Sequence, residues 1–98
     1  MARKKTIKTI LTDFIKSSAK TFGYATTESY LNERASKNFV VLTPSGATGD
    51  NTYEPQFWED GETLVVLNTE ELAKEEAKEY EGATVVTELK LYHLLGIA

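Results

Sequence analysis

Few residues of this chain carry the side chains that catalysis or metal binding most often uses. The 98 residues contain no cysteine and a single histidine, His93, which lies among leucines near the end of the sequence. Without cysteine there is neither a thiol nucleophile nor a thiolate metal site, and one histidine cannot form a multi-histidine site. The HExxH and GxSxG motifs are also absent. We therefore interpret His93 as a structural or surface residue and expect a non-enzymatic protein without a cofactor.

Two other segments contain residues that could hold a phosphate or a cation. The segment from Gly46 to Asp50 has the glycines of a phosphate-binding loop, but it lacks the GK[ST] ending and no helix signal follows it. A group of acids extends beyond this loop, namely Asp50, Glu54, Glu59, Asp60 and Glu62. These acids lack the alternating ligand spacing of an EF-hand. The pattern predicts a surface turn followed by a solvated acidic hairpin, with no metal site.

Charge is unevenly distributed along the chain. The net charge is −4, yet residues 1–20 carry six basic side chains and one acid, whereas the remaining residues carry five basic side chains and fourteen acids. The six basic residues are Arg3, Lys4, Lys5, Lys8, Lys16 and Lys20. A basic segment of this kind favours contact with nucleic acid, although no recognition motif accompanies it. A nucleic-acid-binding accessory protein is our alternative hypothesis.

The acidic body of the chain indicates a different kind of surface. Acidic and aromatic side chains gather in one turn and on one predicted helix, and the candidate binding residues are Trp58, Glu59, Asp60, Glu62, Glu71, Glu75 and Glu79. Such side chains can contact a basic protein surface, including one that normally holds DNA or RNA. The simpler interpretation is a solvated helix face with ordinary charge pairs, such as Glu70 with Lys74. A small protein-binding module is our first hypothesis.

The segment from Thr63 to Tyr92 contains the clearest folding signals. The apolar run Leu64–Leu67 predicts a strand with both faces covered. Asn68 is placed as the N-cap of a helix over 69–81, with Glu71 three residues later to complete a capping box and Gly82 after the helix end.

After Gly82 the hydrophobic pattern alternates as far as Tyr92, which predicts a long strand; a helix that begins at Thr87 is the alternative. In the first case the strands on either side of the 69–81 helix are expected to be parallel in one sheet. Residues 91–95 also match the LxxLL motif of partner-docking helices, but we expect these leucines to belong to the chain's own core.

The remaining patterns complete an α+β domain. They predict an amphipathic helix over 6–22, a short helix over 28–36, a strand over 38–43, a weak strand over 53–58 interrupted by Pro55, and a hairpin turn at Asp60-Gly61. We expect one domain over residues 1–98, in which an antiparallel three-strand meander is extended by a strand-helix-strand unit. The N-terminal helix is expected to pack on the sheet, or to form a homodimer.

The C-terminal third of the chain resembles small bacteriophage proteins. The resemblance lies in the EEAKEY helix at 75–80, the following glycine and the LLGIA ending at 94–98. It implies an accessory role, such as binding and inhibiting a host or defence protein. No apolar run approaches the roughly 20 residues that cross a bilayer, so we expect a cytoplasmic protein without membrane contact.

Overall fold

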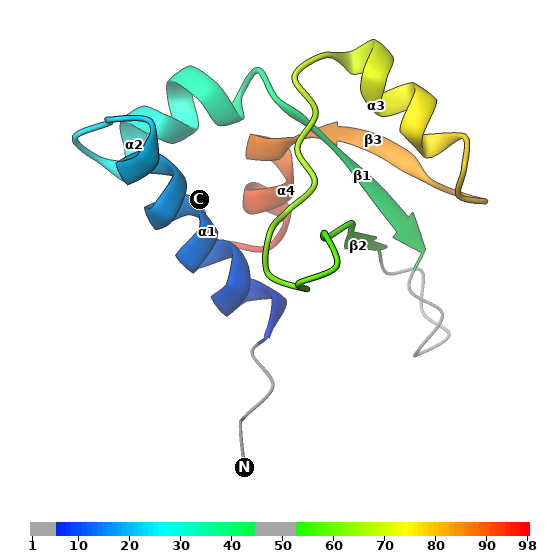
Figure 1. The fold of residues 1–98 in the computed structure, drawn as a ribbon, viewed down its shortest axis with the longest axis horizontal. Helices are drawn as coiled ribbons and strands as arrows, with labels where there is room; N and C mark the ends of the chain where they lie inside the picture. The colour runs from blue at the N-terminus through cyan, green and yellow to red at the C-terminus, as the bar shows by residue number, and fades with distance from the viewer. Residues whose placement is uncertain (1–5, 45–52) are drawn as a thin grey trace.

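The computed structural model describes residues 6–44 and 53–98. The predicted loop from Gly46 to Asp50 and the basic residues Arg3, Lys4 and Lys5 lie outside this part of the chain. The elements follow in the order α1 (Ile7–Thr21), α2 (Thr27–Tyr30), the π-helical turn η1 (Leu31–Ala35), β1 (Phe39–Pro44), β2 (Tyr53–Pro55), α3 (Glu70–Ala77), β3 (Thr84–Thr87) and α4 (Glu88–Leu94) (Figure 1).

The sheet contains three antiparallel strands in the order β2-β1-β3. The central strand, β1, pairs with β3 from Phe39 to Leu42 and with β2 from Leu42 to Pro44. Pro55 therefore lies in an edge strand, as predicted, where its missing backbone N–H does not interrupt a central ladder. The predicted α+β class is confirmed.

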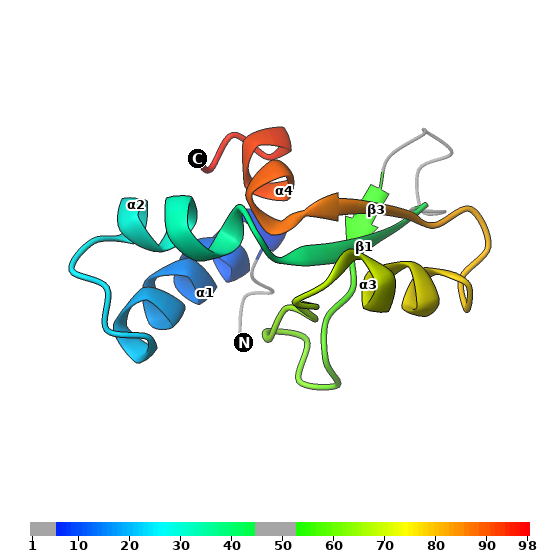
Figure 2. The same cartoon turned by 90° about the horizontal axis from the view of Figure 1, so that it is seen from above.

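Helices cover both faces of the sheet. The side chains of β1 alternate between the two faces, so apolar side chains on each face need a covering layer. Val40 and Leu42 belong to the main hydrophobic cluster with residues of α1 and α4, whereas Val41 is buried on the other face, which α3 covers. Figure 2 shows α3 and α4 on opposite sides of the strands, with α1 beside α2 at one end of the sheet. The N-terminal helix contributes Leu11, Ile15 and Ala19 to the core cluster that contains Val40 and Leu42 of β1, and its most numerous contacts are with α2.

Both N-terminal helices form close to their predicted ranges, and each begins at a threonine cap. The Thr6 Oγ1 accepts a hydrogen bond from the Thr9 N–H at the start of α1, and the Thr26 Oγ1 accepts one from the Ser29 N–H at the start of α2. Gly23, with φ of 78°, follows the end of α1. Within the described residues, no helix is long and apolar enough to cross a membrane.

The predicted strand over 64–67 is wrong, and β3 is the third strand of the sheet in its place. Leu64 and Leu67 form only isolated bridges, to Phe57 and Phe39 respectively. The backbone groups of this segment are divided between two partners: Val65 N–H donates to Gln56, whereas Leu67 exchanges both bonds with Phe39. No continuous ladder forms, so the expected pair of parallel strands around α3 is also absent from the described sheet.

The N-cap of α3 lies one residue beyond the predicted cap, Asn68. Thr69, with extended backbone angles, accepts the Leu72 N–H on its Oγ1 at 3.2 Å, and Asn68 is not the cap. The third helical position is then Leu72 rather than Glu71, so the predicted capping box does not form. The helix ends at Ala77, because Glu79 and Tyr80 donate to carbonyls three residues back and tighten the chain before Gly82.

The predicted long strand ends at Thr87, and the alternative helix is correct. Thr87 caps α4 by accepting the Lys90 N–H on its Oγ1 at 3.1 Å. The helical turn buries Glu88, Leu91 and Tyr92 together on one side, which an alternating strand could not do. Leu91 lies in the core as expected and Leu95 is partly buried, whereas Leu94 is 59% exposed, so the expectation that these leucines belong to the core is wrong for Leu94.

Candidate protein-binding surface

The turn at Asp60 is fixed by its own side chain. The Asp60 Oδ1 accepts the backbone N–H groups of Glu62 and Thr63, each at 2.8 Å, and its Oδ2 accepts the Thr63 hydroxyl at 2.6 Å. These bonds, first that of the Thr63 hydroxyl, lower the pKa of Asp60 below its ordinary value. Gly61 completes the turn with φ of 70°, and the Trp58 N–H donates to the Thr63 carbonyl. The turn therefore presents Trp58 on a defined backbone.

The hairpin formed by residues 56–67 lies beside α3. Its second arm is attached to β1 by two hydrogen bonds between Leu67 and Phe39, of 2.7 and 2.8 Å, and Thr69 then starts the helix. Between the hairpin and α3 lies a hollow of about 310 Å³, which we call the α3 groove. It is lined by Gln56, Phe57, Trp58, Glu59, Val65, Leu67, Glu76 and Tyr80.

Two of the predicted binding residues, Trp58 and Glu59, line the α3 groove. Trp58 is 60% exposed, although it is the chain's one tryptophan and a large apolar side chain. On the helix, the groove is lined by Glu76, which the sequence did not single out. Leu72 precedes Glu76 by one helical turn and is 51% exposed. An exposed apolar side chain therefore lies one helical turn from the groove on α3.

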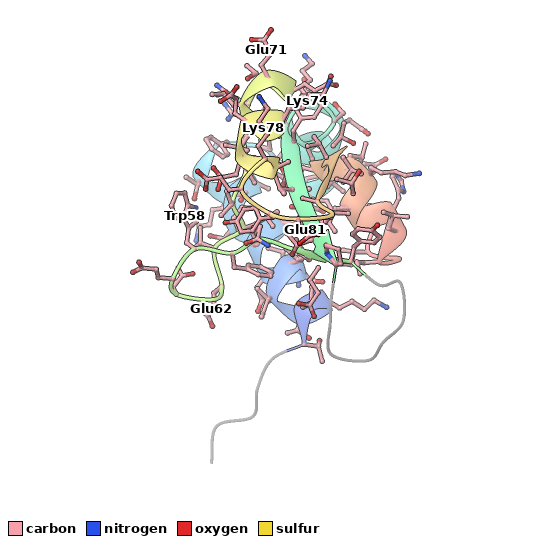
Figure 3. All side chains as sticks on the ribbon, turned by 90° about the vertical axis from the view of Figure 1, so that its right-hand side faces the viewer. Trp58, Glu62, Glu71, Lys74, Lys78 and Glu81 are labelled. Atoms are coloured by element: carbon pink, nitrogen blue, oxygen red, sulfur yellow. The ribbon has the colours of Figure 1, made fainter. Side chains whose placement is uncertain are left out.

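The other predicted acids of α3 lie outside the groove lining. Glu71, Glu75 and Glu79 are exposed, and Glu75 forms an ion pair of 3.4 Å with Lys78. Lys74 pairs with Glu70 at 2.8 Å, which raises the pKa of Lys74. Figure 3 shows Glu71, Lys74 and Lys78 along α3, with Trp58 below the helix. Lysines thus partly neutralise the acidic face of the helix.

The last two predicted binding residues have other neighbours. The Asp60 carboxylate is engaged within its turn, as described above. Glu62 lines a smaller hollow of about 230 Å³ with Asp13 and other residues of α1, and Figure 3 shows it farther from α3 than Trp58 is. The structure thus divides the predicted surface into a groove beside α3 and a turn that faces α1.

Three of the six residues of the alternative, basic surface lie in the part of the chain that the structure describes. Lys8, Lys16 and Lys20 are exposed on α1. The apolar side of α1 is buried in the chain's own core, so a homodimer through this helix would have to use its outer side. The only histidine, His93, is exposed on α4 with its Nδ1 atom 3.1 Å from the carbonyl oxygen of Ala98.

A buried carboxylate is the polar feature that sequence analysis missed. Glu88 has no exposed surface, and it accepts hydrogen bonds from the Tyr30 hydroxyl at 2.7 Å, the Asn38 amide at 3.0 Å and the Tyr92 hydroxyl. Burial, followed by the charge of Glu88, raises the pKa of both tyrosines well above the ordinary value. The helical spacing of Glu88 with Leu91 and Tyr92 was the available signal, because it places the acid on the buried side of a helix.

Comparisons with known proteins found no matching protein family, no matching curated protein and no matching solved structure. Within the described residues, no group of three or more histidine, aspartate or glutamate side chains gathers as a metal site would require.

Proposed function

We propose that this chain is a non-enzymatic, cytoplasmic protein-binding module that contacts a basic protein through the α3 groove. The observation that supports it most is the exposure of Trp58 beside a hollow lined by Phe57 and Tyr80. Large aromatic side chains at the edge of a hollow are the residues that most often supply binding energy at protein interfaces. A partner would insert an apolar side chain between the hairpin and α3.

Charge sets the class of partner. Glu59 and Glu76 line the groove, and further exposed acids extend along α3. Exposed ion pairs such as those of Lys74 and Lys78 contribute little energy and can exchange partners on binding. A surface with arginine or lysine around an apolar anchor is complementary to this face, and charge complementarity would accelerate its association.

The resemblance to bacteriophage proteins suggests where to look for that partner. A host or defence protein whose basic surface normally holds DNA or RNA is complementary in charge to the α3 groove and its surrounding acids. Binding there would cover the nucleic-acid site and inhibit the host protein. Inhibition by occupying a basic surface requires no catalytic residue in this chain.

The test is affinity capture from bacterial lysate treated with nuclease, followed by binding measurements with the captured protein. We expect Trp58→Ala to weaken binding by at least about thirtyfold, because an aromatic anchor commonly contributes 2 kcal/mol or more. Reversal of the groove acids by Glu59→Lys and Glu76→Lys should also weaken binding, and this effect should diminish at high salt. Joint reversal of Glu71, Glu75 and Glu79 should have a smaller effect.

The matched control is Glu33→Lys, which makes the same change of charge on the exposed side of η1. It should leave binding unchanged. Unchanged binding by both Trp58→Ala and the groove reversals would exclude the α3 groove as the interface. A partner that disappears after nuclease treatment, or that is lost from Lys16→Glu and Lys20→Glu variants, would favour the nucleic-acid alternative.

A further inference from the structure

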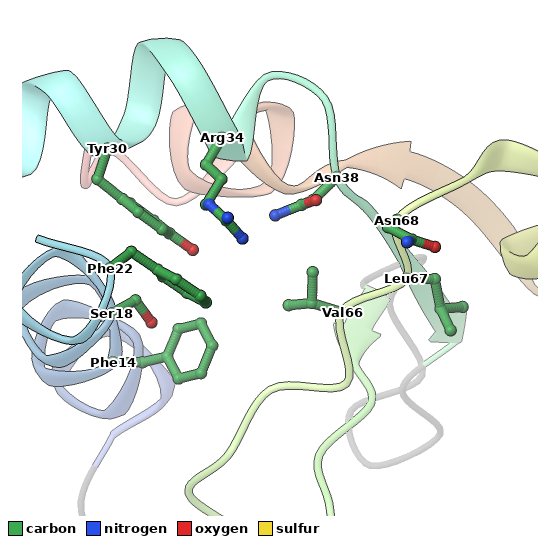
Figure 4. Close-up of a pocket in the computed structure, with 9 residues that line it drawn as sticks. All are labelled: Phe14, Ser18, Phe22, Tyr30, Arg34, Asn38, Val66, Leu67 and Asn68. Atoms are coloured by element: carbon green, nitrogen blue, oxygen red, sulfur yellow. The ribbon is translucent and has the colours of Figure 1, made fainter. Parts of the chain in front are cut away.

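A second cavity, of about 370 Å³, also borders the 65–68 segment: Val66 and Asn68 line this cavity, Val65 lines the α3 groove, and Leu67 lines both. Its walls come from α1, η1 and this segment, and Figure 4 shows their side chains facing a common space. The volume is within the range of small-molecule sites in proteins, which combine apolar walls with a few polar groups. We call it the Arg34 cavity.

Arg34 is the charged group of this cavity. Its guanidinium carbon lies 3.8 Å from the centre of the Phe22 ring, and Phe22 is in turn stacked on Tyr30 with an interplanar angle of 8°. In Figure 4 the guanidinium points from η1 into the space between Phe22 and Asn38. Arg34 is exposed and Phe22 is half-exposed, so this aromatic contact is the interaction that favours the observed orientation of the guanidinium.

No acid of the described residues forms an ion pair with Arg34. The nearest buried carboxylate, Glu88, already accepts from Tyr30 and Asn38, two residues that line the cavity. These two side chains therefore separate the negative charge of Glu88 from the cavity. The fork of N–H donors on Arg34 remains available, and its geometry matches a carboxylate.

The opposite wall is apolar. Phe14 and Val66 face the cavity across from Arg34, and neither offers a hydrogen bond (Figure 4). A ligand that fits both walls has an anionic group at one end and a flat apolar body at the other. We propose that the Arg34 cavity binds a small organic anion, a planar ring that carries one carboxylate, independently of the α3 groove.

The test is an NMR titration of the full chain with phenylacetate, indole-3-acetate and 1-naphthoate, each compared with its neutral amide. At least one acid should shift the Arg34 and Asn38 side-chain resonances with a dissociation constant of about 1 mM or lower. Its amide and acetate should bind roughly tenfold more weakly or worse, because each lacks either the charge or the ring.

Arg34→Met keeps much of the side chain's length but removes its charge and donors, and it should weaken binding about tenfold or more. Lys20→Met removes an exposed charge from α1 and should leave the affinity unchanged; thermal melting verifies that both variants are folded. Equal binding of acid and amide, wild-type affinity in Arg34→Met, or no shift with any of the three acids up to about 10 mM would overturn the proposal.

Discussion

Glu88 has no exposed surface and accepts hydrogen bonds from three neutral donors. These bonds take the place of the water that would solvate an exposed carboxylate. A buried charge loses its hydration, and hydrogen bonds to the charged form compensate for part of that loss. The donors come from three places in the chain, Tyr30, Asn38 and Tyr92. Glu88 therefore joins α2, the start of β1 and α4 at one point. The alternating pattern predicted Glu88 on a strand, and that prediction gave no indication that Glu88 is buried and joins these three elements.

The two buried tyrosines predict how stability changes at alkaline pH. Their pKa values are raised in the folded chain, whereas tyrosine in an unfolded chain ionises at a pH of about 10. Below that pH both states keep these protons; above it the unfolded chain releases protons that the folded chain retains, so the free energy of unfolding falls. In urea melts from about pH 9 to 12, Tyr92→Phe should reduce the steepness of this fall.

A non-titrating core variant, Leu11→Val, is the control for this experiment. It should lower the free energy of unfolding by a similar amount at every pH and leave the slope unchanged. If Tyr92→Phe keeps the wild-type slope, then Tyr92 is not among the groups whose protonation is linked to folding.

At the scale of elements, local signals predicted the helices better than the strands. The two N-terminal helices were predicted from hydrophobic spacing, and they begin at Thr6 and Thr26 because a cap is a contact between residues three apart. The backbone partners of Leu64–Leu67 could not be predicted, because an apolar run does not indicate which segments will form hydrogen bonds with it. The segment after Thr87 could not be assigned from the sequence for a similar reason. Thr87 is a good N-cap, but it lies inside an alternating pattern, and only the burial of both Leu91 and Tyr92 shows that a helix forms.

Gly82 joins α3 to β3 and should tolerate substitution poorly. Its φ is 75°, and a Cβ atom there would lie 3.0 Å from the Pro44 Cγ at the end of β1. Gly82→Ala should lower the free energy of unfolding by about 1–2 kcal/mol, as expected for a side chain in left-handed backbone that also meets a rigid ring.

Gly96→Ala is the matched control for Gly82, because Gly96 has φ of 72° and nothing within 4 Å of its added Cβ. The Gly96→Ala variant has the conformational cost of a side chain in left-handed backbone, but its Cβ meets no neighbouring atom. Chemical denaturation should therefore show a smaller loss for Gly96→Ala. Equal losses in the two variants would mean that the contact with Pro44 has no energetic effect.

At the scale of the whole molecule, function depends on which segments become neighbours. Trp58 and Glu59 were proposed as binding residues because acidic and aromatic side chains gather in their turn, but the sequence could not predict that Glu76 and Tyr80 would line a groove with them. The Arg34 cavity was missed for the same reason, since Phe22, Arg34 and Val66 are distant in sequence. The 65–68 segment contributes to the lining of both hollows.

The central claim, that a protein partner binds the α3 groove, is tested most directly at Trp58. The chain has a single tryptophan, so labelling with 5-fluorotryptophan gives one ¹⁹F resonance that reports on the groove. Addition of the unlabelled captured partner should shift or broaden this resonance in proportion to the bound fraction, because an exposed ring becomes buried. A resonance that stays unchanged while sedimentation shows a saturated complex would contradict the account.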